Sequence, residues 1–96
     1  MAILDGNAPY EEAAAAVRRQ IDAGYPIPTL ILNHKDKGLK DYVWHWFLIN
    51  GYEDAGNTVI VKTVTYSWYQ WIDLRRLWET GYAGRGGLVL YNLTET

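Results

Sequence analysis

Two histidines are the side chains in this sequence best suited to move a proton or to activate a nucleophile. His45 stands in the apolar run of residues 44–49, where strand alternation sets it on one face with Phe47 and Ile49 and sets Trp44, Trp46 and Leu48 on the other. A lone histidine in such a run is more often a partly buried structural side chain than a catalyst. His34 comes just before a polar loop, and we expect it at the surface.

The remaining polar residues predict no metal, thiolate or phosphate site. The sequence has no cysteine, which excludes a disulfide and a cysteine nucleophile within this chain. Two histidines do not supply the three or four ligands of a zinc site. The glycines of residues 81–87 follow a helix and lead into a strand, which is not the order of a phosphate-binding loop. We therefore interpret them as a turn and predict no cofactor.

Aromatic side chains are the other candidates for function, because the 96 residues include five Trp and eight Tyr but one Phe. Rings that carry a polar atom favour positions half in a core and half at a surface. Two interpretations stay open: a stacking platform for a peptide or a sugar, or a sheet face that another segment covers. Under the first, the rings predicted to contact the ligand are those of Trp44, Trp46 and Trp68.

Length and charge restrict the class of protein. A chain of 96 residues that is 49% hydrophobic and 21% charged predicts one folded, soluble domain over residues 1–96. A net charge of −2 offers no basic surface, so nucleic acid and membranes are not expected partners. No stretch has the form of a signal peptide or reaches the roughly 20 apolar residues of a membrane span, and localisation stays open.

The first expected element is a helix over about residues 8–23. Asn7 is the expected N-cap, Pro9 suits the first turn, and a run of four alanines gives high helix propensity. Gly24 is the expected stop. The apolar side of this helix is narrow and rich in alanine, which predicts close packing against a sheet.

Alternating and β-branched segments predict that sheet. The expected strands cover about residues 28–33, 42–52, 58–66, 68–72 and 87–93, with a polar loop at 35–41. Asp73 is the expected N-cap of a short helix at about 73–79. The predicted fold class is therefore α+β, with an N-terminal helix packed on a twisted antiparallel sheet.

Residues 53–57 have the composition of a hairpin turn, so the strands 42–52 and 58–66 should pair antiparallel. The length of the loop decides which residue faces His45 from the second strand. A loop of four residues places Val64 there, a loop of three places Thr65, and a loop of two places Tyr66. The sequence does not choose among these registers.

A longer pattern covers roughly residues 11 to 93. A helix leads through Gly24-Tyr25-Pro26 into a buried strand, and residues 45–54 read His-Trp-Phe-Leu-Ile-Asn-Gly-Tyr-Glu-Asp. This order resembles the C-terminal half of papain-like cysteine peptidases, in particular the bacterial bacteriocin-leader-peptidase type. The resemblance implies a papain-like barrel half, with His45 as the catalytic histidine. It also implies an orienting group near Thr65, where the family has Asn or Asp, with Ser67 as second choice.

The resemblance implies a function that this chain could not perform alone. Without a thiolate there is no acyl-enzyme, so the chain would be the His-bearing half of a papain-like peptidase fold and would need a Cys-bearing segment upstream to cleave a peptide substrate. The alternative is a non-catalytic module that binds a peptide or a sugar on its Trp/Tyr surface. An exposed half-barrel also predicts a homodimer that covers its apolar surface.

Overall fold

The structure is a computed structural model, and it describes residues 2–65, 68–81 and 86–91. As the sequence predicts, the fold is α+β, with an antiparallel sheet and two α-helices among these residues. The strands are β1 (Ala2–Asp5), β2 (Ile27–Ile31), β3 (His45–Ala55), β4 (Thr58–Thr65), β5 (Trp68–Asp73) and β6 (Gly87–Leu90). The helices are α1 (Tyr10–Asp22), α2 (Leu74–Trp78) and the 3-10 helix η1 (Lys37–Tyr42).

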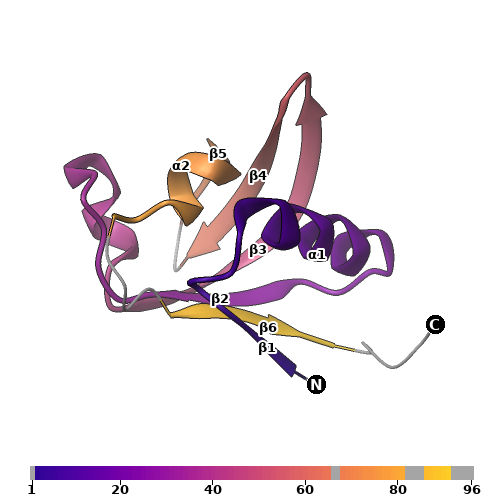
Figure 1. Cartoon of the computed structure of the whole chain (residues 1–96), viewed down its shortest axis with the longest axis horizontal. Coiled ribbons are helices and arrows are strands. Elements are labelled where there is room, and N and C mark those ends of the chain that lie inside the picture. Colours follow the sequence, from indigo (N-terminus) through magenta and orange to yellow (C-terminus); the bar gives the residue numbers. More distant parts are fainter. Residues whose placement is uncertain (1, 66–67, 82–85, 92–96) are drawn as a thin grey trace.

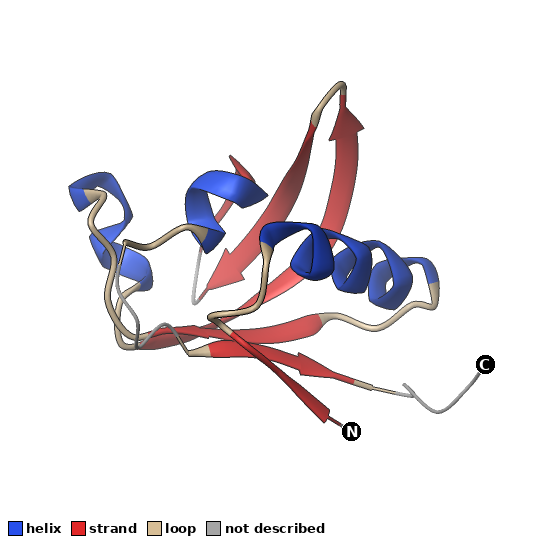
Figure 2. Ribbon diagram, in the orientation of Figure 1, coloured by secondary structure: helices blue, strands red, loops and turns tan. Residues whose placement is uncertain are grey.

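The sheet is strongly bent, and both α-helices lie on its inner side (Figures 1 and 2). Its strand order is β1-β6-β2-β3-β4-β5. The strands β1, β6 and β2 lie together at the bottom of the view, while the β3–β4 hairpin rises steeply behind α1 (Figure 1). The core lies between sheet and helices and includes the fully buried Ile27, Ile49, Val61, Leu74 and Leu88. No helix within the described ranges is long and apolar enough to cross a membrane.

Helix α1 starts two residues later than predicted, and its N-cap is Pro9 rather than Asn7. Asn7 belongs to the preceding turn, where its backbone N–H donates to Asp5 Oδ1 at 2.7 Å. The helix ends close to the predicted stop, where Gly24 has a φ of +90°. The alanine-rich side packs on the sheet as expected, because small side chains let the helix axis approach; its buried residues include Ala13, Ala16 and Val17.

Strand β1 is an element that the sequence prediction missed. It pairs with β6, and β6 in turn pairs with β2, so the last described strand lies between the first two. Two glycines permit this close approach. A Cβ on Gly86 would overlap the carbonyl oxygen of Leu30, and one on Gly87 would overlap that of Leu4. Gly86 and Gly87 are therefore packing positions rather than parts of a simple turn, while residues 82–85 and 92–93 lie outside the described ranges.

The β3–β4 hairpin has none of the three predicted registers. Its loop is the pair Gly56-Asn57, and Gly56 has a φ of +67°, which suits the first position of a type II′ turn. Ala55 pairs with Thr58, so β3 extends three residues further toward the loop than expected while β4 starts at Thr58 as predicted, and a bulge between Ile49 and Gly51 shifts the pairing again. The described β3–β4 ladder reaches only the pair Leu48–Val64. His45 pairs instead with Ile31 of β2.

Several boundaries also differ from the prediction. The polar loop at 35–41 contains η1, and the expected strand from residue 42 starts only at His45. The cause is Trp44, whose φ of +59° interrupts the extended backbone just before β3. The prediction for the short helix is confirmed at its start: Asp73 Oδ1 accepts a hydrogen bond from the Arg75 N–H at 2.8 Å, and α2 follows directly.

Candidate functional site

The outer side of the sheet, away from both helices, carries a continuous row of apolar side chains. Cross-strand pairing joins Ile3 to Val89, Pro28 to Leu48, Leu48 to Val64, and Val64 to Tyr69. The register Thr29–Leu88, continued by one residue, sets Val89 beside Pro28. The row therefore crosses all six strands. We call this side the open face; its described members include Ile3, Pro28, Leu30, Trp46, Leu48, Ile60, Lys62, Val64, Tyr69, Trp71 and Val89.

Large rings on the open face are exposed to an unusual degree. Tyr69 is 63% exposed, Trp46 59% and Trp71 48%, and Ile3 at the β1 edge is 68% exposed. On the other side of the same strands, Phe47, Ile49 and Val61 are buried under the helices. Contiguous exposed apolar area of this kind marks an interaction surface more often than scattered single residues do. The open face is therefore the main candidate site.

A charged group stands among these rings. The Lys62 Nζ lies 4.7 Å from the centre of the Tyr69 ring, a cation–π arrangement. Trp71, the cross-strand partner of Lys62, reaches over β4 so that its ring lies against Gly51. Lys62 is thus flanked by two aromatic side chains on β5. These three side chains bring a positive charge to the aromatic part of the open face, and Glu53 and Asp73, the cross-strand partners of Ile60, add carboxylates near the hairpin end.

A hollow of about 260 Å³ opens where β3 and β4 separate. It lies beyond the last described pair of that ladder, Leu48–Val64. Its lining is Pro28, Trp46, Phe47, Leu48, Val64 and Thr65. The described lining residues include no ionisable side chain, and the hydroxyl of Thr65 among them is buried.

His45 and Thr65 do not form the hydrogen bond that the sequence led us to expect. The side chain of His45 is half-buried and lies on the side of β3 that carries Phe47 and Ile49, as predicted. Thr65 stands further along the neighbouring strand, opposite Phe47 if the Leu48–Val64 register continues. Its Oγ1 is buried and has no hydrogen-bond partner among the described groups. The second choice, Ser67, lies outside the described residues.

The three tryptophans predicted to contact a ligand do not share one surface. Trp46 is on the open face. Trp68 pairs with Thr65 and makes an edge-on ring contact with the buried Tyr42 at 5.7 Å between centroids. Trp44 lies before β3 and is 71% exposed. Sequence reasoning did not single out Tyr69 and Lys62, because their place beside Trp71 depends on the β4–β5 register.

His34 has a structural role that the sequence did not indicate. Its Nδ1 accepts a hydrogen bond from the Asp36 N–H at 3.0 Å, so its Nε2 carries the proton and donates to the Arg76 carbonyl at 2.9 Å. Asp36 Oδ2 also accepts from Arg76 Nε at 2.6 Å. That bond and one from the Gly38 N–H lower the pKa of the Asp36 carboxyl, while the carboxylate raises the pKa of Arg76. The network joins the segment after β2 to α2.

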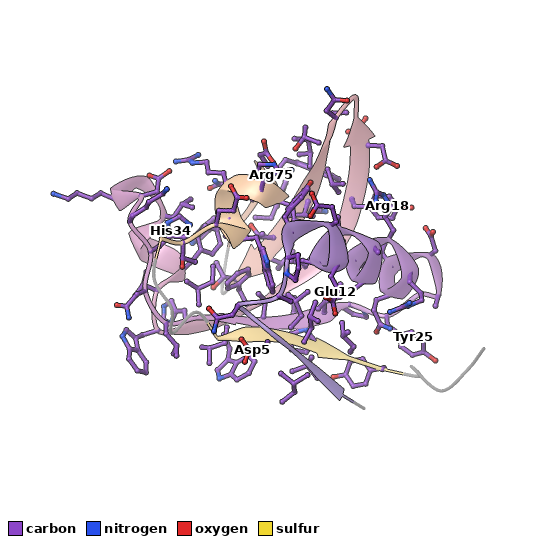
Figure 3. The ribbon with its side chains drawn as sticks, viewed as in Figure 1. Asp5, Glu12, Arg18, Tyr25, His34 and Arg75 are labelled. Atoms are coloured by element: carbon purple, nitrogen blue, oxygen red, sulfur yellow. The ribbon has the colours of Figure 1, made fainter. Side chains whose placement is uncertain are left out.

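A second, charged hollow of about 300 Å³ lies beside this network, between His34 and Arg75 (Figure 3). Its arginines are already engaged: Arg76 pairs with Asp36, and Arg75 pairs with Glu79 at 2.9 Å. On the opposite side of the molecule, Arg18 of α1 pairs with Asp54 of β3 at 2.8 Å. These contacts hold elements together, so we assign them to the scaffold.

No group of three His, Cys, Asp or Glu side chains able to hold a metal ion occurs among the described residues. The open face remains the main candidate site, and its described side chains are mainly aromatic and aliphatic. Comparison of the chain with protein-family models, with curated proteins and with solved structures found no match in any of the three.

Proposed function

We propose that the chain is a non-catalytic module that binds an extended peptide on its open face. The observation that carries this proposal is the row of apolar and aromatic side chains across all six strands, on the side that neither helix covers. Burial of exposed Trp and Tyr side chains is the main source of affinity in many protein interfaces. Trp46, Tyr69 and Trp71 supply three such rings on one surface.

The composition of the open face favours a peptide over a sugar. A sugar stacked on a ring needs neighbouring polar groups to bond its hydroxyls, and hydroxyls left unbonded at a buried contact are costly. The neighbours of Trp46 on this face are Leu30, Leu48 and Pro28, which are apolar. A peptide can place apolar side chains there and satisfy its backbone elsewhere.

Strand β5 offers a place for the peptide backbone. It ends the strand order, and no described strand pairs with its second edge. Proline and charged side chains are the two features that usually block such an edge, and β5 has no proline and a charge only at its last residue, Asp73. A peptide added there would form main-chain hydrogen bonds, and Tyr69 and Trp71 would contact its side chains on the open face.

Selection from a random-peptide display library on the immobilised chain tests the proposal, followed by calorimetric titration of an enriched peptide. Trp71→Ala should weaken binding about tenfold or more, because it removes a large exposed ring beside the edge to which the peptide would be added. Glu12→Ala, on the exposed side of α1, is the control and should leave the affinity unchanged. Enrichment of no peptide, or enrichment only of glycans on an array, would overturn the proposal. So would a homodimer that Trp71→Ala dissociates, because a second copy would then occupy the face.

The His-bearing half of a papain-like peptidase fold is the second candidate. The observation in its favour is that His45 is the first residue of β3 and is half-buried rather than enclosed. Thr65 gives His45 no orienting hydrogen bond, so another group would have to hold the imidazole. The test is the reading frame upstream of Met1. A cysteine at a helix start there, with peptidase activity that His45→Ala abolishes, would support this candidate.

A further inference from the structure

Lys62 is a half-buried cation on the open face without a carboxylate partner. Its side chain is partly covered, and its Nζ forms no ion pair with any described carboxylate. Arg19, Lys35 and Lys37 also lack such a partner, but they are exposed and keep their hydration. A charge that has lost part of its hydration interacts more strongly with an opposite charge than an exposed one does. An anion would therefore gain more at Lys62 than at those three side chains.

The Lys62 side chain extends away from the acidic side chains of the same face. Along β4, Lys62 stands between the level of Tyr69 and the level of Glu53 and Asp73. Its Nζ lies toward the Tyr69 side, 4.7 Å from the centre of that ring. Asp73 Oδ1 already accepts two hydrogen bonds from other groups. The positive charge of Lys62 is therefore presented at the Tyr69 end of the open face, apart from the carboxylates at the hairpin end.

This charge is presented beside the free edge of β5. Lys62 belongs to β4, but its Nζ lies over a ring of β5, the end strand. A strand added to β5 would run about 4.8 Å from it. Every second side chain of that strand would stand on the open face, beside Tyr69 or Trp71. A short acidic side chain beside Tyr69 would then be within reach of the ammonium group.

The surroundings of Lys62 favour a carboxylate over a phosphate. Lys62 is the only lysine or arginine within the bounds of the six described strands. One ammonium group matches the single negative charge of a carboxylate, whereas a phosphate near its second ionisation carries close to two charges and is usually held by several cationic donors. The two rings beside Lys62 can also pack on the methylene groups of an acidic side chain.

We infer that Lys62 recognises a carboxylate of the bound peptide, supplied by an Asp or Glu side chain that lies beside Tyr69 on the strand added to β5. The inference rests on the proposed peptide-binding function and adds to it the class of one recognised side chain. Tyr69 and Trp71 hold the ammonium group in place, and Lys62 distinguishes a carboxylate from the neutral amide of the same shape.

Two small probes test the Lys62 site without any peptide: 3-phenylpropionate, which has a ring and a carboxylate, and 3-phenylpropionamide, which lacks the charge. Backbone amide shifts of residues 62, 69 and 71 in heteronuclear NMR spectra of the whole chain report binding. At pH 7 and low salt the carboxylate should bind about three- to tenfold more tightly than the amide. Lys62→Gln should abolish this preference, and Lys62→Arg should keep it. Lys37→Gln, the same change of charge on the exposed side of η1, should leave it unchanged.

The enriched peptide, prepared with an amidated C-terminus, provides the second arm of the experiment. Replacement of one acidic residue of the peptide by its amide should weaken binding about three- to tenfold, and the same replacement should have no effect on binding to the Lys62→Gln chain. Because the C-terminus carries no charge, the effect then belongs to a side chain. Sodium chloride at 0.5 M should reduce it.

Three results would overturn the inference: equal binding of the two probes or no saturable shift at these residues, a preference that survives Lys62→Gln, or a peptide whose acidic residues show no coupling to Lys62. If the peptide binds without such coupling, the carboxylate site fails and the peptide-binding function stands. If the probes show the Lys62-dependent preference and no peptide is enriched, the carboxylate site stands and the peptide-binding function fails.

Discussion

The indole of Trp71 lies across β4 against Gly51 of β3, with its Cη2 atom 3.7 Å from the position that a Cβ at residue 51 would occupy. Lys62 stands between them in the same cross-strand row, and its Cβ is 3.5 Å from that position. Because residue 51 is a glycine, the indole of Trp71 can lie close to the backbone of β3 at this point. One glycine in β3 thus helps to set how the Trp71 ring of the end strand β5 is presented on the open face.

Gly51→Ala should nevertheless be tolerated. Both contacts of the new methyl group are ordinary van der Waals distances, so the substitution should raise the free energy of unfolding by about 0.5 kcal/mol through the lower entropy of the unfolded chain. Gly86→Ala is the contrasting variant, because its methyl group would overlap the Leu30 carbonyl; it should cost about 2 kcal/mol or more. Thermal unfolding followed by circular dichroism measures both. Equal losses in the two variants would contradict the contacts described.

Thr65→Val and Thr63→Val should change stability in opposite directions. Removal of an unbonded buried hydroxyl should stabilise the fold by about 1 kcal/mol, since valine has nearly the same shape. Removal of the Thr63 hydroxyl leaves the buried Tyr42 hydroxyl without that partner and should cost about 1–3 kcal/mol. Urea unfolding measures each difference. A destabilised Thr65→Val variant would show that the Thr65 hydroxyl has a partner in solution.

Gln20→Ala should lower the free energy of unfolding by more than the replacement of an exposed glutamine would. The side-chain amide of Gln20 is 2% exposed and makes two hydrogen bonds to the backbone of Tyr91: Nε2 donates to the carbonyl at 2.7 Å, and Oε1 accepts from the N–H at 2.8 Å. The loss of both should cost about 2–3 kcal/mol. Arg19→Ala, the exposed neighbour on α1, is the control and should change stability by less than about 0.5 kcal/mol.

Asp36 should make stability depend on pH in the acid range. Hydrogen bonds from Arg76 and from the Gly38 N–H lower its pKa below the ordinary 3.8, so the folded state binds this proton more weakly than the unfolded chain does. The stabilisation is therefore present above pH 3.8 and is lost as pH falls through the lower folded value. The Tm difference between the parent chain and Asp36→Asn should be constant from pH 7 to roughly 5 and narrow below about 4.

Salt provides the control for that experiment. The Asp36–Arg76 pair is at the surface, so 1 M NaCl should reduce the Tm difference at pH 7. A difference that widens toward acid pH would contradict the direction of the pKa change. Glu12→Gln, at an exposed position of α1, should show a small difference throughout.

The elements that the sequence predicted correctly are those with local signals. Helix α1 has its alanine run and its glycine stop, and α2 has an aspartate cap; these features act within a few residues. Strand β1 has no such signal, because four residues become a strand only when β6 pairs with them from the far end of the chain. The hairpin register failed because the turn is Gly56-Asn57 and β3 continues to Ala55, which the composition of residues 53–57 does not specify, and the bulge near Asn50 then shifts the pairing again.

The site was only partly predictable. Strand alternation predicted that the side chains of Trp46 and Phe47 point to opposite faces of the sheet, and the structure confirms this prediction. To predict that Trp46 shares a face with Tyr69 and Trp71, one would need the registers of the three strands β3, β4 and β5. The expected pairing of His45 with Thr65 assumed that the β3–β4 ladder reaches the start of β3, whereas its described part begins at Leu48 and residues 45–47 pair with β2. The hollow opens beyond this described part, and no local pattern in the sequence encodes it.

The position of β6 between β1 and β2 has a consequence for how the protein is made. Synthesis runs from the N-terminus, so β1 and α1 emerge before the strand that must lie between β1 and β2 exists. Contacts that span almost the whole chain form slowly, because the entropy of closing the loop is lost before they form. We therefore expect the β2–β5 ribbon to assemble first. On the ribosome, Leu4 would then stay without its sheet neighbour until Leu88 has been added.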